Sequence, residues 1–240
     1  MLRKLYWLIV AITGFALITA AAHATTHEFY KGKTIRIIAG FAAGGGFDTY
    51  ARAISRHMGR HIPGNPPLVV ENMTGAGSLI AANHVYNVAK PDGLTIGHFT
   101  GGLFLGQVLG QKGIQFDARK FEFIGAPVKD HVVCALTTAS GITSIEKWMA
   151  SKTPVKLGAT GPGAIPYDTP KIIQAALGLP IHLVAGYKGT ADIRLAAESG
   201  EIAGGCWPWQ SIKATWTKGI ESGDVVIVAQ MFPQPHPDLP

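Results

Sequence analysis

The sequence has few charged residues and few cysteines, and each shortage excludes a class of protein. Charged side chains make up 15% of the 240 residues, and no more than two lysines or arginines are adjacent. Because nucleic-acid-binding surfaces gather basic residues, this scatter argues against a nucleic-acid partner. The two cysteines, Cys134 and Cys206, lack the spacing of a metal site. The sequence leaves undecided whether these cysteines form a disulfide or stay as two buried free thiols.

Glycine-rich segments are frequent, but none has the spacing of a nucleotide-binding loop. Gly32-Lys33-Thr34 resembles the end of a phosphate-binding loop, yet His27 stands where the first glycine is required. The segments GGGFDTYA and GAGSLIA both lack the dinucleotide-binding pattern, and in the second Ile80 replaces the third glycine. The sequence also contains no GxSxG motif, although a catalytic triad scattered along the chain is not excluded by this absence.

The first 24 residues have the pattern of an export signal. Arg3 and Lys4 form a basic start, residues 5–20 form an uncharged apolar run, and Ala22-His23-Ala24 is a small-x-small cleavage site. Since the run is shorter than the roughly 20 residues of a membrane-spanning helix, we predict cleavage after Ala24. Cleavage leaves 19 basic and 15 acidic residues, a net charge of +4 that favours small anions.

The segment Ile35 to Met58 has the pattern of a strand, a glycine turn and a helix. It begins with branched apolar residues, continues through three glycines at 44–46, and ends with apolar residues at helical spacing. Glycines leave the N–H groups of such a turn uncovered, and the start of the following helix carries a partial positive charge. We therefore expect an anion site here, with Asp48 either capping the helix or contacting the ligand.

The same strand, loop and helix pattern recurs along the chain. In a parallel sheet the carboxyl ends of such strands meet at one edge, where the ligands of open α/β folds bind. A hinge between two such units is expected near Gly125 to Pro127. The further strands with their loops are Leu68–Asn72 with 73–77, Val155–Ala159 with 160–163, and Ile181–Val184 with 186–190.

Four segments together resemble a known family. IRIIAGFAAGGGFDTYAR, VVENMTGAGSLIAANHV, AKPDGLTI and GYKGTADIRLAAESGEI are similar, in order and spacing, to the periplasmic substrate-binding proteins of tripartite tricarboxylate transporters, the Bug receptor family. The resemblance implies an α/β fold with two lobes like those of type II periplasmic binding proteins, each a mostly parallel sheet flanked by helices. Lobe 1 would span 25–124, completed by 230–240 and by a further segment beyond Pro240, and lobe 2 would span 125–229.

The resemblance also implies a function and a set of site residues. A monomeric periplasmic receptor would capture a small carboxylate between its lobes, without a cofactor, and deliver it to membrane permease subunits. From the residues alone, the competing hypothesis is an exported hydrolase acting on a small anionic substrate. The implied ligand-binding residues are Phe41, Gly45, Gly46, Asp48, Thr49, Asn72, Gly75, Ala76 and Gly77 in the first lobe, and Thr160, Gly161, Tyr187, Lys188 and Gly189 in the second.

Overall fold

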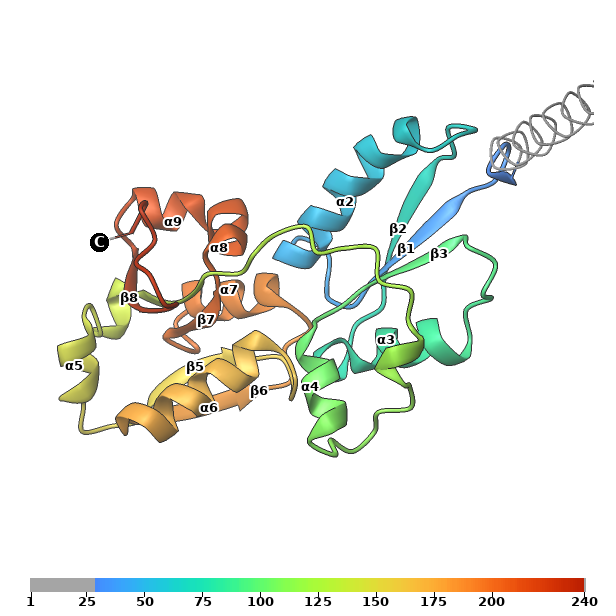
Figure 1. Ribbon diagram of the computed structural model, residues 1–240. Coiled ribbons are helices and arrows are strands. Elements are labelled where there is room, and N and C mark those ends of the chain that lie inside the picture. Colours follow the sequence, from blue (N-terminus) through green and yellow to red (C-terminus); the bar gives the residue numbers. More distant parts are fainter. Residues whose placement is uncertain (1–28, 240) are drawn as a thin grey trace, which may run out of the picture.

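The computed structural model describes residues 29–239, so the predicted export signal and its cleavage site lie outside the described part (Figure 1). The strands form two separate sheets, with the orders β2-β1-β3 and β6-β5-β7-β4-β8. The strands are β1 (Ile35–Ala39), β2 (Leu68–Asn72), β3 (Thr95–His98), β4 (Val132–Thr137), β5 (Val155–Ala159), β6 (Ile181–Ala185), β7 (Gly204–Pro208) and β8 (Val225–Met231). The predicted β/α alternation is confirmed.

The α-helices follow the strands and pack against them. No helix within residues 29–239 has the length and apolar character needed to cross a membrane. The helices are α2 (Gly46–Met58), α3 (Leu79–Asn87), α4 (Gly102–Val108), α5 (Ile145–Met149), α6 (Ile165–Leu177), α7 (Thr190–Glu198), α8 (Trp209–Thr215) and α9 (Thr217–Glu221).

The first sheet is parallel throughout. β1 lies in the centre and pairs in parallel with both β2 and β3. Its residues Ile37, Ile38 and Ala39 are buried, as expected for the central strand of a parallel sheet. α2 contacts β1 and β2, while α3 contacts β1 and β3. The carboxyl ends of the three strands consequently open on one edge, and the start of α2 lies at that edge.

The second sheet is mixed, because β4 runs antiparallel to both β7 and β8. Side chains alternate between the two faces of a strand, so two cores form. On one face Val133 and Ala135 pack with Ile193 of α7. On the other face Leu136 packs with Trp148 of α5. β5 runs parallel to β6 and β7, which places the carboxyl ends of these three strands at one edge, facing the first sheet.

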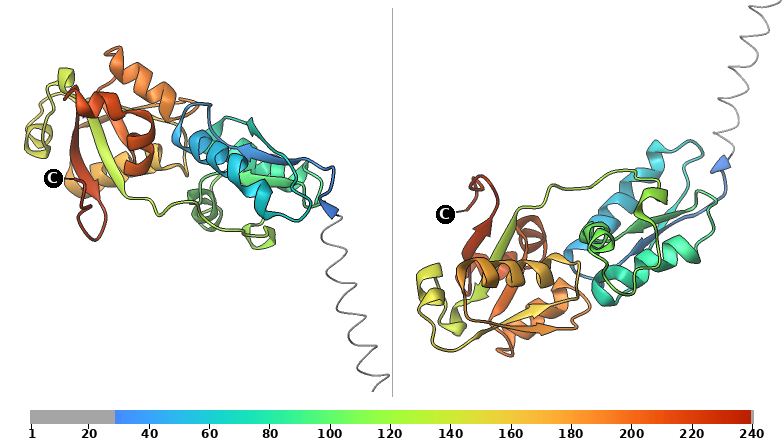
Figure 2. Two further views of the ribbon diagram at one scale, coloured as in Figure 1. Left: turned by 90° about the horizontal axis from the view of Figure 1, so that it is seen from above. Right: turned by 60° about the horizontal axis from the view of Figure 1, so that its bottom comes forward.

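The segment from 121 to 131 carries the chain from the first sheet to the second (Figure 2). We propose that the boundary between the lobes lies in it, near Gly125, since each side of it has its own sheet. The expected use of 230–240 to complete lobe 1 is not what the structure shows. Met231 ends β8 in the second sheet, and Asp238 pairs with Lys213 of α8 at 2.7 Å. These residues pack on the second lobe because β8 leads them away from the first sheet.

Cys134 and Cys206 form a disulfide, which decides between the two alternatives that their spacing left open. They lie directly opposite each other on β4 and β7, and both side chains are fully buried. The bond joins residues 72 positions apart in the sequence. The disulfide therefore links β4 to β7, the strand that ends in Trp207 and Pro208.

Replacing both cysteines, Cys134→Ala with Cys206→Ala, is expected to lower the free energy of unfolding by about 2–4 kcal/mol, because the unfolded chain gains conformational freedom. Urea unfolding with and without a thiol reductant measures this loss. The reductant should destabilise the parent and leave the double variant unchanged. Free thiols in the unreduced, unfolded parent would show that the bond does not form.

Candidate ligand-binding site

The glycine turn after β1 delivers the start of α2 to the space between the two sheets. Gly45 is the N-cap of α2, and it offers no side chain to cap the helix. The N–H group of Gly46 donates to the Thr190 hydroxyl of the second lobe over a long 3.4 Å. The predicted capping role of Asp48 is therefore wrong. The helix begins at Gly46, two residues before Asp48, so Asp48 is the third residue of the helix and not its N-cap.

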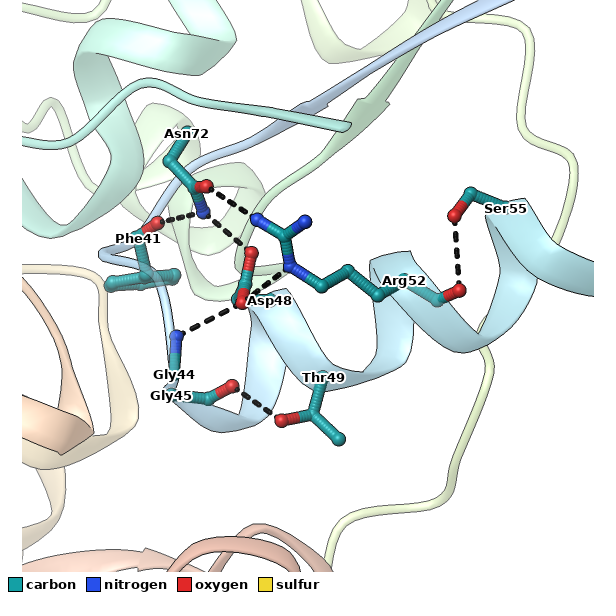
Figure 3. A network of polar contacts seen from close by, with 8 residues as sticks. All are labelled: Phe41, Gly44, Gly45, Asp48, Thr49, Arg52, Ser55 and Asn72. Atoms are coloured by element: carbon teal, nitrogen blue, oxygen red, sulfur yellow. Dashed lines mark hydrogen bonds and ion pairs between the residues drawn. The ribbon is translucent and has the colours of Figure 1, made fainter. Parts of the chain in front are cut away.

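Asp48 instead holds the turn in place (Figure 3). Its carboxylate accepts hydrogen bonds from the Gly44 N–H at 2.9 Å, the Arg52 guanidinium at 2.9 Å and the Asn72 amide at 3.0 Å. The Asn72 amide also donates to the carbonyl of Phe41 at 2.9 Å. Burial alone would raise the pKa of Asp48, but the hydrogen bonds from Arg52, Gly44 and Asn72 lower it below its usual range. Asp48 and Asn72 thus position the loop.

A cavity of about 1010 Å³ lies between the lobes, against the start of α2. Four of the fourteen predicted site residues line it: Phe41, Gly45, Gly46 and Thr160. Thr49 does not line it, and its hydroxyl donates to the Gly45 carbonyl at 3.0 Å. The cavity therefore collects part of the first glycine loop and the residue that follows β5, while ligand contact by these residues stays a prediction.

Three residues of the second lobe that line this cavity have a buried polar side-chain atom without a partner. Among residues 29–239, the hydroxyl of Thr160, the indole N–H of Trp207 and the hydroxyl of Ser211 have no hydrogen-bond partner. These residues are 6%, 0% and 4% exposed. Each group is able to donate a hydrogen bond, and an unpaired buried donor is costly. We call these residues, together with Gly45, Gly46 and Thr190, the donor end of the cavity.

The donor end lies at the start of α2. A Cβ atom added to Gly46 would come within 2.1 Å of the Ser211 hydroxyl, which shows how closely the two lobes meet there. Thr160 follows β5 and Trp207 ends β7, and these strands are parallel neighbours. The site thus combines a helix N-terminus from lobe 1 with strand ends from lobe 2.

Tyr50 adds a donor from the first lobe. Tyr50 lines the cavity, and its buried hydroxyl has no hydrogen-bond partner within the described part of the chain. Burial, followed by the nearby carboxylate of Asp130, raises the pKa of Tyr50 to about 12. The phenol consequently stays protonated at neutral pH and remains able to donate a hydrogen bond.

His98, at the end of β3, also lines the cavity and was not among the predicted residues. Its Nδ1 has no hydrogen-bond partner in the part of the chain that the structure describes. Its ring lies 4.8 Å from the ring of Phe47, which in turn lies 4.6 Å from the ring of Phe41. Burial lowers the pKa of His98 more than its hydrogen bond to the Phe47 backbone raises it. The imidazole is thus neutral at neutral pH. We call Phe41, Phe47 and His98 the ring row.

The second predicted glycine loop lies outside the cavity. Gly75, Ala76 and Gly77 do not line it, and all three have positive φ angles. Gly77 packs on Gly161, so closely that an added Cβ would lie 2.8 Å from the Gly161 carbonyl oxygen. The predicted loops 75–77 and 161 therefore contact each other across the lobes.

The predicted residues of the third loop also lie outside the cavity. The Tyr187 hydroxyl donates to Glu201 at 2.8 Å, which binds it within the second lobe. The Lys188 carbonyl accepts a hydrogen bond from the Ala42 N–H of the first lobe at 3.0 Å. Gly189 approaches the same Ala42, with an added Cβ 3.1 Å from its nitrogen. This loop joins the lobes beside the donor end.

Further polar contacts, between residues 100–111 of the first lobe and 162–163 of the second, hold the lobes together. The Thr100 hydroxyl donates to the Gly163 carbonyl at 3.5 Å, and the Gln111 amide donates to the Pro162 carbonyl at 3.2 Å. An added Cβ on Gly102 would come within 2.1 Å of the Gly163 carbonyl oxygen. Glycines at these points allow the two backbones to meet, so the structure has its lobes in contact.

Within residues 29–239, no group of three histidine, cysteine or acidic side chains is placed to hold a metal ion. The chemistry available at the donor end is therefore that of neutral hydrogen-bond donors and a helix N-terminus.

Comparisons with protein-family models and with curated proteins gave no match. Solved structures do match. MatC from Rhodopseudomonas palustris, with bound malate, is 23% identical over 86% of this chain and 70% of its own, with a TM-score of 0.73. The periplasmic binding protein BugD is 23% identical over 88% and 70%, with a TM-score of 0.69. An R. palustris protein with adipate is 18% identical over 86% and 68%, with a TM-score of 0.66.

These similarities establish the fold. It is the two-lobed α/β fold of periplasmic solute-binding proteins, and the resemblance to the Bug type predicted from the sequence motifs is confirmed at this level.

Asp48→Asn should lower the free energy of unfolding by about 1 kcal/mol at pH 7, because it removes a mostly buried carboxylate whose partner Arg52 is half exposed to solvent. Because folding lowers the pKa of Asp48, the charged carboxylate stabilises the folded protein. This stabilisation is complete above the pKa of Asp48 in the unfolded chain, and it is lost as the pH falls through the lower pKa in the folded protein. Thermal unfolding from pH 7 downwards should therefore show the two proteins converging below about pH 4. Asp92→Asn, in an exposed turn, is the control; a constant gap at all pH values would contradict the assignment.

Gly102→Ala should hold the lobes apart, because its Cβ would collide with the Gly163 carbonyl oxygen. Its neighbour Gly101 provides a matched control, since a Cβ there meets nothing within 4 Å. Small-angle X-ray scattering should give a larger radius of gyration for Gly102→Ala than for Gly101→Ala. Equal radii would mean that the contact between Gly102 and Gly163 does not form in solution.

Proposed function

We propose that the protein is an extracytoplasmic solute-binding receptor that captures a small carboxylate between its two lobes. The observation that carries this proposal is the donor end, where Ser211 and Thr190 of the second lobe meet the N-terminus of α2 and the unpaired Thr160 and Trp207 line the same cavity. A carboxylate offers acceptors for all of these groups at once, and its negative charge suits the helix N-terminus.

The first loop supplies the fixed half of this site. Asp48 and Asn72 hold the glycine turn against α2, so its N–H groups are oriented before the ligand arrives. The Gly45 and Gly46 N–H groups make long bonds, 3.5 Å to the Ala42 carbonyl and 3.4 Å to the Thr190 hydroxyl, which a carboxylate would replace. The hydroxyls of Thr160 and Ser211 approach from the other lobe and complete the site only when the lobes are in contact. Ligand binding would therefore favour the closed arrangement.

The structural neighbours support the choice of anion. MatC was solved with malate and the second R. palustris protein with adipate, and both ligands are carboxylates. By analogy with these periplasmic proteins, and with the predicted export signal, we place the chain in the periplasm. There it would deliver its ligand, as a monomer, to membrane permease subunits of a tripartite tricarboxylate-type transporter.

The competing hypothesis, an exported hydrolase, has less support. A nucleophilic hydroxyl is activated by a base within hydrogen-bond reach. Within residues 29–239, the buried hydroxyls of Thr160 and Ser211 have no such partner. The donor end is thus arranged to bind an anion and hold it, and we propose that the protein is not an enzyme.

Thr160→Val and Ser211→Ala should each weaken carboxylate binding about tenfold, because each removes a hydrogen bond to a charged group worth about 1.5 kcal/mol. Isothermal titration calorimetry against a panel of mono-, di- and tricarboxylates measures the effect.

Thr137→Val is the matched control for this experiment. Thr137 is a buried threonine of the same lobe, but its hydroxyl donates to the Ala203 carbonyl, and the residue lies outside the cavity. This variant is expected to lose stability and to keep the parent affinity. If none of the carboxylates binds the parent, or if Thr160→Val and Ser211→Ala bind as the parent does, the proposed site is wrong.

A further inference from the structure

The charges around the cavity suit one carboxylate and not two. Four charged residues line it, and all of them are exposed: Lys90, Lys120, Glu122 and Asp130. None belongs to the donor end, whose members are all neutral. The nearby cation Arg52 does not line the cavity and is paired with Asp48. The donor end therefore neutralises an anion with hydrogen bonds and a helix N-terminus alone.

The ring row occupies the first-lobe side of the cavity beside the donor end. Phe47 directly follows Gly46 and lies between Phe41 and His98. Ile37 and Ile96 extend this apolar wall along the first sheet. Such a wall suits an apolar or aromatic body, since burying it against rings removes apolar surface from water and allows ring contacts.

A second carboxylate would be poorly accommodated there. Placed against the ring row, it would lose its hydration beside Phe41 and Phe47, and the neutral imidazole of His98 carries no charge to compensate it. Burial and then the carboxylate of Asp130 raise the pKa of the Tyr50 phenol, and the charge of Asp130, which also lines the cavity, would repel a further anion. Both effects act against dicarboxylates.

From this arrangement we propose that the ligand is a monocarboxylate with an aromatic or bulky apolar body. Its carboxylate binds at the donor end, and its body packs on Phe41, Phe47 and His98. This inference rests on the proposed function and narrows it to a ligand class different from the malate and adipate of the structural neighbours.

The test compares ligands on the mature chain by isothermal titration calorimetry at about 0.1 M ionic strength. Benzoate and phenylacetate serve as the aromatic monocarboxylates, and succinate, malate and adipate as the dicarboxylates. We expect the aromatic monocarboxylates to bind at least about tenfold more tightly than any of the dicarboxylates. Tighter binding of a dicarboxylate would overturn this inference and leave the proposed function standing. Binding of neither class would overturn both.

A variant makes the comparison independent of the chosen ligands. Phe47→Lys places a cation in the ring row, so it should weaken benzoate binding and shift the preference toward succinate by about tenfold or more. Phe47→Leu, which stays apolar, should weaken benzoate binding without strengthening succinate binding. Phe116→Leu removes a buried ring from the same lobe outside the cavity and should leave both affinities unchanged. An unchanged preference in Phe47→Lys would contradict the assigned position of the apolar body.

Discussion

The buried carboxylate of Asp48 is the interaction on which the site depends. It binds the backbone of the glycine turn, the first helix and, through Asn72, the end of β2. Three glycines in sequence are flexible by themselves, so without these bonds the turn would lose its shape. With them, the N-terminus of α2 is held at the carboxyl edge of the first sheet. A residue that does not line the cavity thereby determines where the N-terminus of α2, the core of the proposed anion site, is held.

The second lobe contacts the first lobe through backbone atoms as much as through side chains. Glycines 77, 102 and 161 lie at points where a Cβ would collide with the opposite lobe, and the Ala42 N–H donates to the Lys188 carbonyl. Close contact brings Ser211 and Thr190 to the start of α2, in the cavity that Thr160 and Trp207 also line. In the proposed function, an anion that accepts from several of the unpaired donors relieves the cost of leaving them unpaired. The proposal thereby links closure to ligand binding.

Much of the fold is predictable from the sequence, because strands, glycine turns and helices follow local patterns. β2 begins and ends as expected, and the start of α2 lies at the predicted glycine turn. The site is predictable only in part. Nothing local reveals that Gly77 packs on Gly161 and not on a ligand, since that depends on how the lobes meet. His98 and Ser211 are single residues at element ends without a motif, and only the tertiary structure brings them to the cavity.

The most direct test of this account is a crystal structure of the mature chain with benzoate bound. The account predicts the carboxylate at the start of α2, its oxygens within about 3.2 Å of the Gly46 N–H and of the Thr160 or Ser211 hydroxyl. The ring should lie against Phe47, with the lobes in contact. A carboxylate bound elsewhere, for example on the N–H groups of loop 75–77 with the lobes parted from Gly161, would contradict it.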